Sequence, residues 1–330
     1  MRRVNRELAA LQARFLAYYN ENLGNKFSGL EKVRRKYLFF FWKWLFIFVA
    51  LIAGLIYWCG VWPALGAYFD SKAGEYTVAA ILVVMFLTLS HPFTAYKSET
   101  KKQTMDKILA FFGNFRYAEG RGTDEHVLCK SGLIGKYDRQ YGDDFFTGTY
   151  NGVNMQVSEE RLTIVVQTNK GSRESTVFKG IIIVLDMNKP FSGQTVVRDD
   201  WGFFNFLMFA PRCVIKNETV KLEKVCLEDS VFERKFEAFS NDQVEARYLL
   251  TTAFMDRILE VKKRFHGRKI EFSFFDNKLF IAVSTGKDMF ETTSLFSTTA
   301  RYGRMREVVS QFYSVFSIID LLKLNKKTGL

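Results

Sequence analysis

Two long apolar stretches near the N-terminus constrain this 330-residue chain more than any other feature. The first, residues 38–61, reads LFFFWKWLFIFVALIAGLIYWCGV, and the second, residues 76–93, reads YTVAAILVVMFLTLSHPF. A helix needs about 20 mostly apolar residues to cross the ~30 Å hydrocarbon core of a bilayer. Neither stretch repeats the polar face that a surface helix of a soluble protein shows. We therefore predict a transmembrane helical hairpin over residues 38–93.

The charges that flank the two stretches predict the topology. Residues 1–37 contain nine Lys or Arg and three acidic residues, whereas the segment between the stretches contains one basic residue, Lys72. Further lysines follow the second stretch. Basic residues near the ends of spans stay on the cytoplasmic side. Both termini and the main domain are therefore expected in the cytoplasm, with a short external loop around residues 70–74.

The same charges indicate a lipid partner. The net charge is +12, and half of that excess lies within residues 1–37. Basic residues beside a membrane attract anionic headgroups, and residues 97–330 contain no basic stripe interleaved with aromatic residues that would favour nucleic acid. Lys43 lies close enough to the end of its span to reach the interface, and the tryptophans beside it are typical of an interface belt. The expected membrane-interface residues are Arg34, Arg35, Lys36, Trp42, Lys43 and Trp44.

The remaining patterns predict an α+β fold. We expect a basic amphipathic arm over residues 1–37 with a helix that stops at Gly24, the hairpin over residues 38–93, a stalk helix over residues 94–113 and a cytosolic α+β domain over residues 114–330. Strands are segregated from helices rather than alternating with them. The domain is large enough for one core or for two sub-domains that meet near residue 228.

Several local signals place individual elements of this domain. Asn151-Gly152 between alternating residues predicts a hairpin with a type I′ turn. A second hairpin is expected over residues 270–284, with its turn at 276–277. Residues 231–239 alternate like a strand. Ser240 followed by Gln243 resembles a capping box, which predicts a helix from residue 241 to about residue 267.

A search for catalytic chemistry finds no assembled motif. The three histidines are far apart, and no phosphate loop or nucleophile elbow is present. Acidic pairs occur at residues 143–144, 159–160 and 199–200. Adjacent residues of a strand point to opposite faces, so such pairs do not form a two-carboxylate site by themselves, and we interpret them as solvated loop residues. We expect no catalytic residues, no cofactor and no metal.

An uncharged aromatic segment, residues 201–210, is too short to span a bilayer. Burial in the core, a loop that dips into the membrane and a surface for a partner are all open readings. Its candidate interaction residues are Trp201, Phe203, Phe204 and Phe206.

The stretch DQVEARYLLT, residues 242–251, carries a resemblance to a known family. Together with Phe178-Lys-Gly180, Phe232-Glu-x-x-Phe236 and Phe290-Glu291, it resembles a bacterial family catalogued as domain of unknown function three-one-three-seven. The resemblance covers about residues 95–295 and the upstream double span. It implies a bacterial inner-membrane protein with a cytosolic α+β domain. Because some members are encoded near LemA-family membrane proteins, it also implies a membrane complex with a protein partner.

Within this stretch, Asp242, Glu245, Arg247 and Tyr248 are candidate interaction residues. Asp242 and Glu245 lie at the start of the expected helix, where negative charge suits the helix dipole. Arg247 is expected to be at least partly buried and to pair with an acid of a neighbouring element, because Tyr248 and the two leucines after it are expected in the core.

Two functions of different classes remain. The first is a non-enzymatic inner-membrane protein that presents a cytosolic domain for protein–protein interaction. The alternative is a membrane-tethered enzyme that acts on a lipid or another membrane-associated substrate. The sequence leaves open whether the chain also forms a homo-oligomer.

Overall fold

The computed structural model divides the chain into two compact units. The first contains residues 1–107 and 292–306, and the second contains residues 108–291 and 307–330. Within them the structure describes residues 2–61, 67, 71–168, 171–187, 190–199, 212–215, 218–266, 268–292, 294–296 and 302–324. Long apolar helices and a large antiparallel sheet confirm the predicted α+β class.

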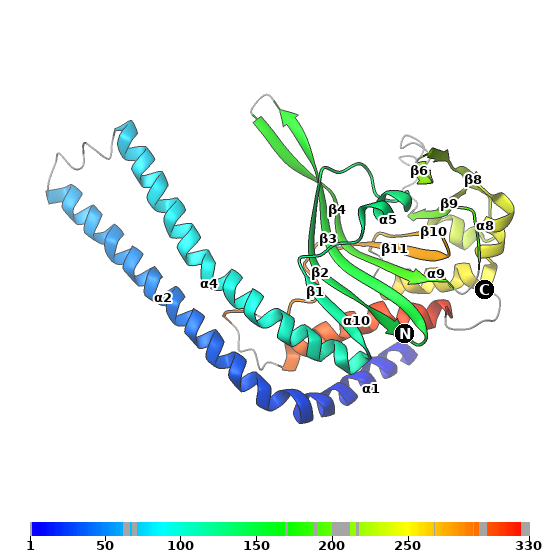
Figure 1. The fold of residues 1–330 in the computed structure, drawn as a ribbon, viewed down its shortest axis with the longest axis horizontal. Helices are drawn as coiled ribbons and strands as arrows, with labels where there is room; N and C mark the ends of the chain where they lie inside the picture. The colour runs from blue at the N-terminus through cyan, green and yellow to red at the C-terminus, as the bar shows by residue number, and fades with distance from the viewer. Residues whose placement is uncertain are drawn as a thin grey trace. The chain divides into compact units, whose positions relative to one another are not determined.

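The first unit begins with a helix that does not stop where the sequence predicted. Helix α1 (Arg2–Tyr18) passes into a π-helical turn, η1 (Tyr19–Leu23), and then directly into α2 (Gly24–Val61). The expected stop at Gly24 is therefore wrong. A π turn holds an extra residue, so the helical hydrogen bonding continues while the apolar face is rotated. The basic arm and the first apolar stretch form one helical run (Figure 1).

The second apolar stretch belongs to α4 (Lys72–Phe112), which also contains the expected stalk and encloses Pro92. Residues 29–58 and helix α4 are each long and apolar enough to cross a membrane. Only 6% of the most apolar stretch of each helix is buried. Phe46 is 75% exposed and Phe86 is 70% exposed. In water such surfaces would be strongly unfavourable, which favours a membrane environment over a soluble core.

Contacts within the first unit join α2 and α4. The hydroxyl of Tyr37 donates to Glu99 at 2.8 Å. The rings of Phe41, Phe93 and Phe296 lie with centroids 5.3–5.4 Å apart. Aromatic edge-to-face pairs of this kind are worth about 0.5–1.5 kcal/mol beyond their burial.

The second unit is built on a nine-stranded sheet with the order β1-β2-β3-β4-β11-β10-β5-β9-β8. Every neighbouring pair is antiparallel. The strands are β1 (Phe115–Glu119), β2 (Arg139–Tyr150), β3 (Val153–Thr168), β4 (Gly171–Asp186), β5 (Thr195–Asp199), β8 (Glu223–Val225), β9 (Phe236–Ser240), β10 (Ile270–Phe275) and β11 (Lys278–Ser284). A separate hairpin joins β6 (Arg212–Ile215) and β7 (Glu218–Lys221). Strands from both sides of residue 228 share the large sheet, so residue 228 does not separate two sheets.

Helices contribute to the hydrophobic core of the second unit. On one face, Leu128 of α5 (Glu125–Lys130) packs in a cluster with residues of β3, β4 and β11. Elsewhere on the sheet, α10 (Tyr302–Leu322) presents Phe312, whose ring centroid lies 5.0 Å from that of Phe146 on β2. Phe254 of α9 (Thr252–Arg264) packs 5.9 Å from Phe274 of β10.

Both predicted hairpins are confirmed. Asn151 and Gly152 have φ of 47° and 80° between β2 and β3, as a type I′ turn requires. The expected strand over residues 231–239 is wrong in its first half, which forms a short helix, α7 (Ser230–Glu233). Asp229 caps this helix by accepting from the N–H groups of Val231 and Phe232. A side-chain cap of this kind favours the helical turn over the extended backbone.

Candidate functional site

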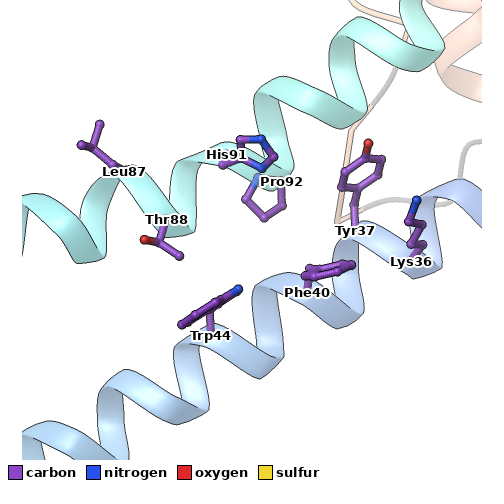
Figure 2. Close-up of a pocket in the computed structure, with 8 residues that line it drawn as sticks. All are labelled: Lys36, Tyr37, Phe40, Trp44, Leu87, Thr88, His91 and Pro92. Carbon is purple, nitrogen blue, oxygen red and sulfur yellow. The ribbon is translucent and has the colours of Figure 1, made fainter.

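A groove between α2 and α4 lies where the membrane interface was predicted. It has a volume of about 560 Å³. Figure 2 shows Tyr37, Phe40 and Trp44 on α2 facing His91 and Pro92 on α4. Lys36 lies at one end of the groove, and its Nζ is 5.7 Å from the centroid of the Tyr37 ring. An apolar groove with a cation at its end suits an acyl chain with an anionic headgroup.

The predicted interface residues differ in their environments. Arg34 is buried, and it donates to both carboxylate oxygens of Glu31 and, at 3.0 Å, to the carbonyl of Leu295. Its charge therefore holds together parts of the first unit. The others are exposed: Arg35, Lys36, Trp42, Lys43 and Trp44. The side chains of these five residues are accessible at the surface of the first unit.

The DQVEARYLLT stretch forms a helix with a different cap from the one predicted. Helix α8 (Gln243–Leu249) is capped by Asp242, which accepts from the N–H groups of Val244 and Glu245, both at 2.9 Å. Ser240 ends strand β9 instead. The predicted capping box is therefore wrong, because an aspartate two residues later offers an ionised acceptor. Leu250 ends α8, and Thr251 caps a second helix, α9, where one long helix was expected.

Glu245 has a structural role that the sequence did not reveal. Its two carboxylate oxygens accept from the N–H groups of Ser192 at 2.9 Å and Gly193 at 2.5 Å. Beside it, Asn241 accepts from the N–H of Gln194 at 2.7 Å. The start of α8 thus fixes the loop that leads into β5, and Asp242 and Glu245 are used within the fold.

Arg247 and Tyr248 are exposed, which contradicts the burial predicted for both. The core contacts of α8 are made by Ala246 and Leu249, which are fully buried. Tyr248 is 55% exposed and Val244, one turn earlier, is 78% exposed. Arg247 also lines a hollow of about 180 Å³ with residues around the start of α9. Leu249 and Leu250, which were also expected in the core, are buried as predicted.

The aromatic residues Trp201, Phe203, Phe204 and Phe206 lie outside the described residues. Among the described residues, no group of three or more His, Cys, Asp or Glu side chains could hold a metal ion.

The acidic pairs were interpreted wrongly as solvated loops. Glu159 and Glu160 are in strand β3 and are only 5% and 1% exposed. Glu160 accepts from the N–H of Thr123 at 2.5 Å and from the amide of Gln140 at 2.7 Å, while Glu159 accepts from the N–H of Met289 at 2.7 Å. The two side chains do point to opposite faces, as expected for a strand.

Comparison with known proteins supports the resemblance. Residues 176–324 match the family described as "Protein of unknown function (DUF3137)". That region contains both α8 and the sheet strands from β4 onward. No curated protein matches the chain in sequence. The crystal structure of the mycobacterial trehalose monomycolate transport factor A, TtfA, is similar at 11% identity, covering 67% of this chain and 95% of that one, with a TM-score of 0.32.

Proposed function

We propose that this chain, which resembles DUF3137 proteins over residues 176–324, is a non-enzymatic protein that presents its α+β domain to a protein partner at a membrane. In this proposal α2 and α4 span the bacterial inner membrane, and both termini and the main domain are cytoplasmic. The exposed basic residues and tryptophans of the interface contact anionic lipid. A LemA-family membrane protein is the proposed partner.

The observation that carries the partner role is the outer face of α8. Val244, Arg247 and Tyr248 follow one another at helical spacing and are all exposed. Arginine and tyrosine are enriched among residues that dominate binding energy at interfaces, where they fill hollows of the partner surface. The hollow beside Arg247 offers a complementary place for a partner side chain. The inward residues of the same helix, Ala246 and Leu249, are fully buried in the core, whereas these three side chains are exposed to a partner.

Site-specific photo-crosslinking in native membranes tests this proposal. A photoreactive phenylalanine analogue at Tyr248 should give one discrete protein adduct, and mass spectrometry should identify a LemA-family protein. The analogue at Val166, an exposed residue of the β3–β4 hairpin, is the positional control. Arg247→Ala should abolish the Tyr248 adduct, while Lys263→Ala, which removes an exposed cation from α9, should leave it intact.

Adducts of equal yield at both positions, or an adduct that survives Arg247→Ala, would refute the α8 surface as the binding face. Adducts only with lipid would refute a protein partner at this position.

A further inference from the structure

A second candidate site lies within the sheet of the second unit. It is a cleft of about 240 Å³ over the middle of strands β2, β3 and β4. The side chains that line it include Tyr141, Asp143, Glu159, Arg161, Lys179 and Asp288. All belong to one unit, and none is part of the α8 surface. Neither of the two functions expected from the sequence assigned a role to these cleft residues.

Glu159 is the least satisfied group in this cleft. Its side chain is almost completely buried, and one oxygen accepts from the N–H of Met289 at 2.7 Å. The other oxygen, Oε2, is buried without a hydrogen-bond partner among the described residues. A buried polar atom that is left unpaired costs about 1–3 kcal/mol of folding free energy. The cost is larger when the group is charged. An unpaired acceptor beside a cavity therefore indicates that a donor from outside can complete the site.

The local fold keeps this carboxyl in place. A bulge in β2 between Gly142 and Phe145 brings Asp143 and Asp144 opposite this part of β3. Glu160 follows Glu159 in the chain. In the sheet its backbone lies opposite Gly142 of β2 on one side and opposite Gly180 of β4 on the other. A Cβ at Gly180 would lie 2.0 Å from the carbonyl oxygen of Val283, so only glycine fits there. The backbone beneath the cleft is thus rigidly packed.

The charges around Glu159 favour a positive ligand. Burial is the main cause that raises the pKa of Glu159 to about 8. The hydrogen bond from the N–H of Met289 opposes this rise, and the negative charges of nearby aspartates add to it. The two cations of the cleft are already engaged. Lys179 pairs with Asp288 at 2.8 Å, and the guanidinium of Arg161 stacks 4.6 Å from the Tyr141 ring centroid.

We propose that this cleft binds an ammonium group, from a small free amine or from a lysine side chain, which donates to Oε2 of Glu159. The volume is below the range of about 300–1,000 Å³ typical of drug-sized ligands, which suits a group of this size. A charge-assisted hydrogen bond would satisfy the orphan oxygen, and the surrounding carboxylates would stabilise the positive charge.

Binding of this kind releases a proton. The bound form needs an ionised Glu159, and below pH 8 this group is mostly protonated in the free protein. The ionised fraction rises from about 3% at pH 6.5 to about 90% at pH 9, so affinity should rise roughly 30-fold over that range. An amine with a pKa near 10.4 keeps its charge there. Three carboxylates act on Glu159 through their charge: Asp143, Asp144 and Asp288. The other charged groups of the cleft are Glu160, Arg161 and Lys179. Beyond it, Tyr117 donates to Asp144, and Arg268 contacts the sulfur of Met289.

Isothermal titration calorimetry on the full chain in phosphatidylcholine nanodiscs tests the proposal, with empty nanodiscs subtracted. The probes are 1,4-diaminobutane, a capped Gly-Lys-Gly tripeptide, uncharged 1,4-butanediol and MgCl₂. Saturable binding of either amine that tightens about 30-fold from pH 6.5 to 9, with proton release, is expected. Comparing the tripeptide with 1,4-diaminobutane shows whether the ammonium group comes from a lysine side chain or from a small free amine.

Three variants make the assignment specific. Glu159→Gln keeps an oxygen for Met289 but cannot ionise, so it should weaken amine binding at pH 9 by more than 10-fold. Asp143→Asn should weaken it less and provides a second readout if the first variant does not fold. Glu223→Gln, which removes an exposed acid from strand β8 away from the cleft, should leave it unchanged. Failure of both amines to bind, equal binding of the diol, or saturation by Mg²⁺ alone would overturn the proposal. These outcomes leave the α8 crosslinks untouched, so the two proposals fail separately.

Discussion

The most informative single substitution is Glu159→Gln, measured as stability in the absence of any amine. In the unfolded chain a glutamate has its ordinary pKa of 4.5, whereas burial in the folded protein raises that of Glu159 to about 8. Between these two pH values the folded state holds a proton that the unfolded state has lost. Stability therefore falls as pH rises through this window, and the loss is complete above pH 8.

The size of this effect follows from the pKa difference. Each pH unit between 4.5 and about 8 contributes about 1.4 kcal/mol. The carboxyl thus destabilises the folded state by at most about 5 kcal/mol at pH 9 and by about 3 kcal/mol at pH 7. Glutamine is neutral at every pH and keeps an acceptor for the N–H of Met289. The variant should match the wild type near pH 4 and exceed it increasingly toward pH 9.

Thermal melts of the full chain in nanodiscs at several pH values measure this difference. In a domain of about this size, each kcal/mol of added stability raises the melting temperature by roughly 2–4 °C. The variant should therefore melt about 10 °C or more above the wild type at pH 9. Subtracting the two curves at each pH removes the contributions of all other groups. Glu223→Gln, which removes an exposed acid from strand β8, is the control and should melt within about 2 °C of the wild type at pH 9. A variant that melts at or below the wild type at pH 9 would refute the argument that Glu159 is buried as an unpaired acid.

The remaining predictions concern topology and helix α8. A cysteine placed at Ser71 should react with an impermeant thiol reagent from outside, and one at Gln140 only after permeabilisation; the reverse pattern would exclude a cytoplasmic domain. Arg247→Ala should change the free energy of unfolding by less than about 1 kcal/mol, because the side chain is exposed, and a larger loss in a denaturation curve would contradict that exposure. Asp242→Ala should cost about 1 kcal/mol through the lost cap. Glu245→Ala should cost about 1–3 kcal/mol, because the N–H of the buried Gly193 loses its acceptor, and increased hydrogen exchange at residues 192–193 would show it.

The features that the sequence predicted well are those with a local cause. The two apolar stretches are long enough to predict helices without any knowledge of the surrounding fold. The Asn151-Gly152 pair allows the positive φ of a tight hairpin turn whatever surrounds it. The turn at Asp276-Asn277, where both residues have positive φ, likewise identified the hairpin of β10 and β11.

Competing local signals misplaced the cap of α8. Ser240 and Asp242 both suit the start of a helix, and the sequence cannot say which one the chain uses. Ser240 is committed to β9, where its hydroxyl lies 3.0 Å from that of Thr195 on the neighbouring strand β5. That pairing joins residues 45 apart and leaves Asp242 as the cap. Arg247 and Tyr248 are exposed because α8 packs on the core through Ala246 and Leu249 instead.

The apolar stretches, the charge asymmetry around them and the short turns are properties of the sequence itself, because each depends on neighbours within a few residues. The acidic cleft was decided by tertiary structure alone. Glu159 and Glu160 look like a solvated pair in the sequence, and they are buried because β2 and β4 pair with β3 on both sides. The loop after β11 then supplies Met289 from 130 residues away. No local sequence pattern predicts such a contact. The burial that raises the pKa of Glu159 is produced by elements that are distant in the chain.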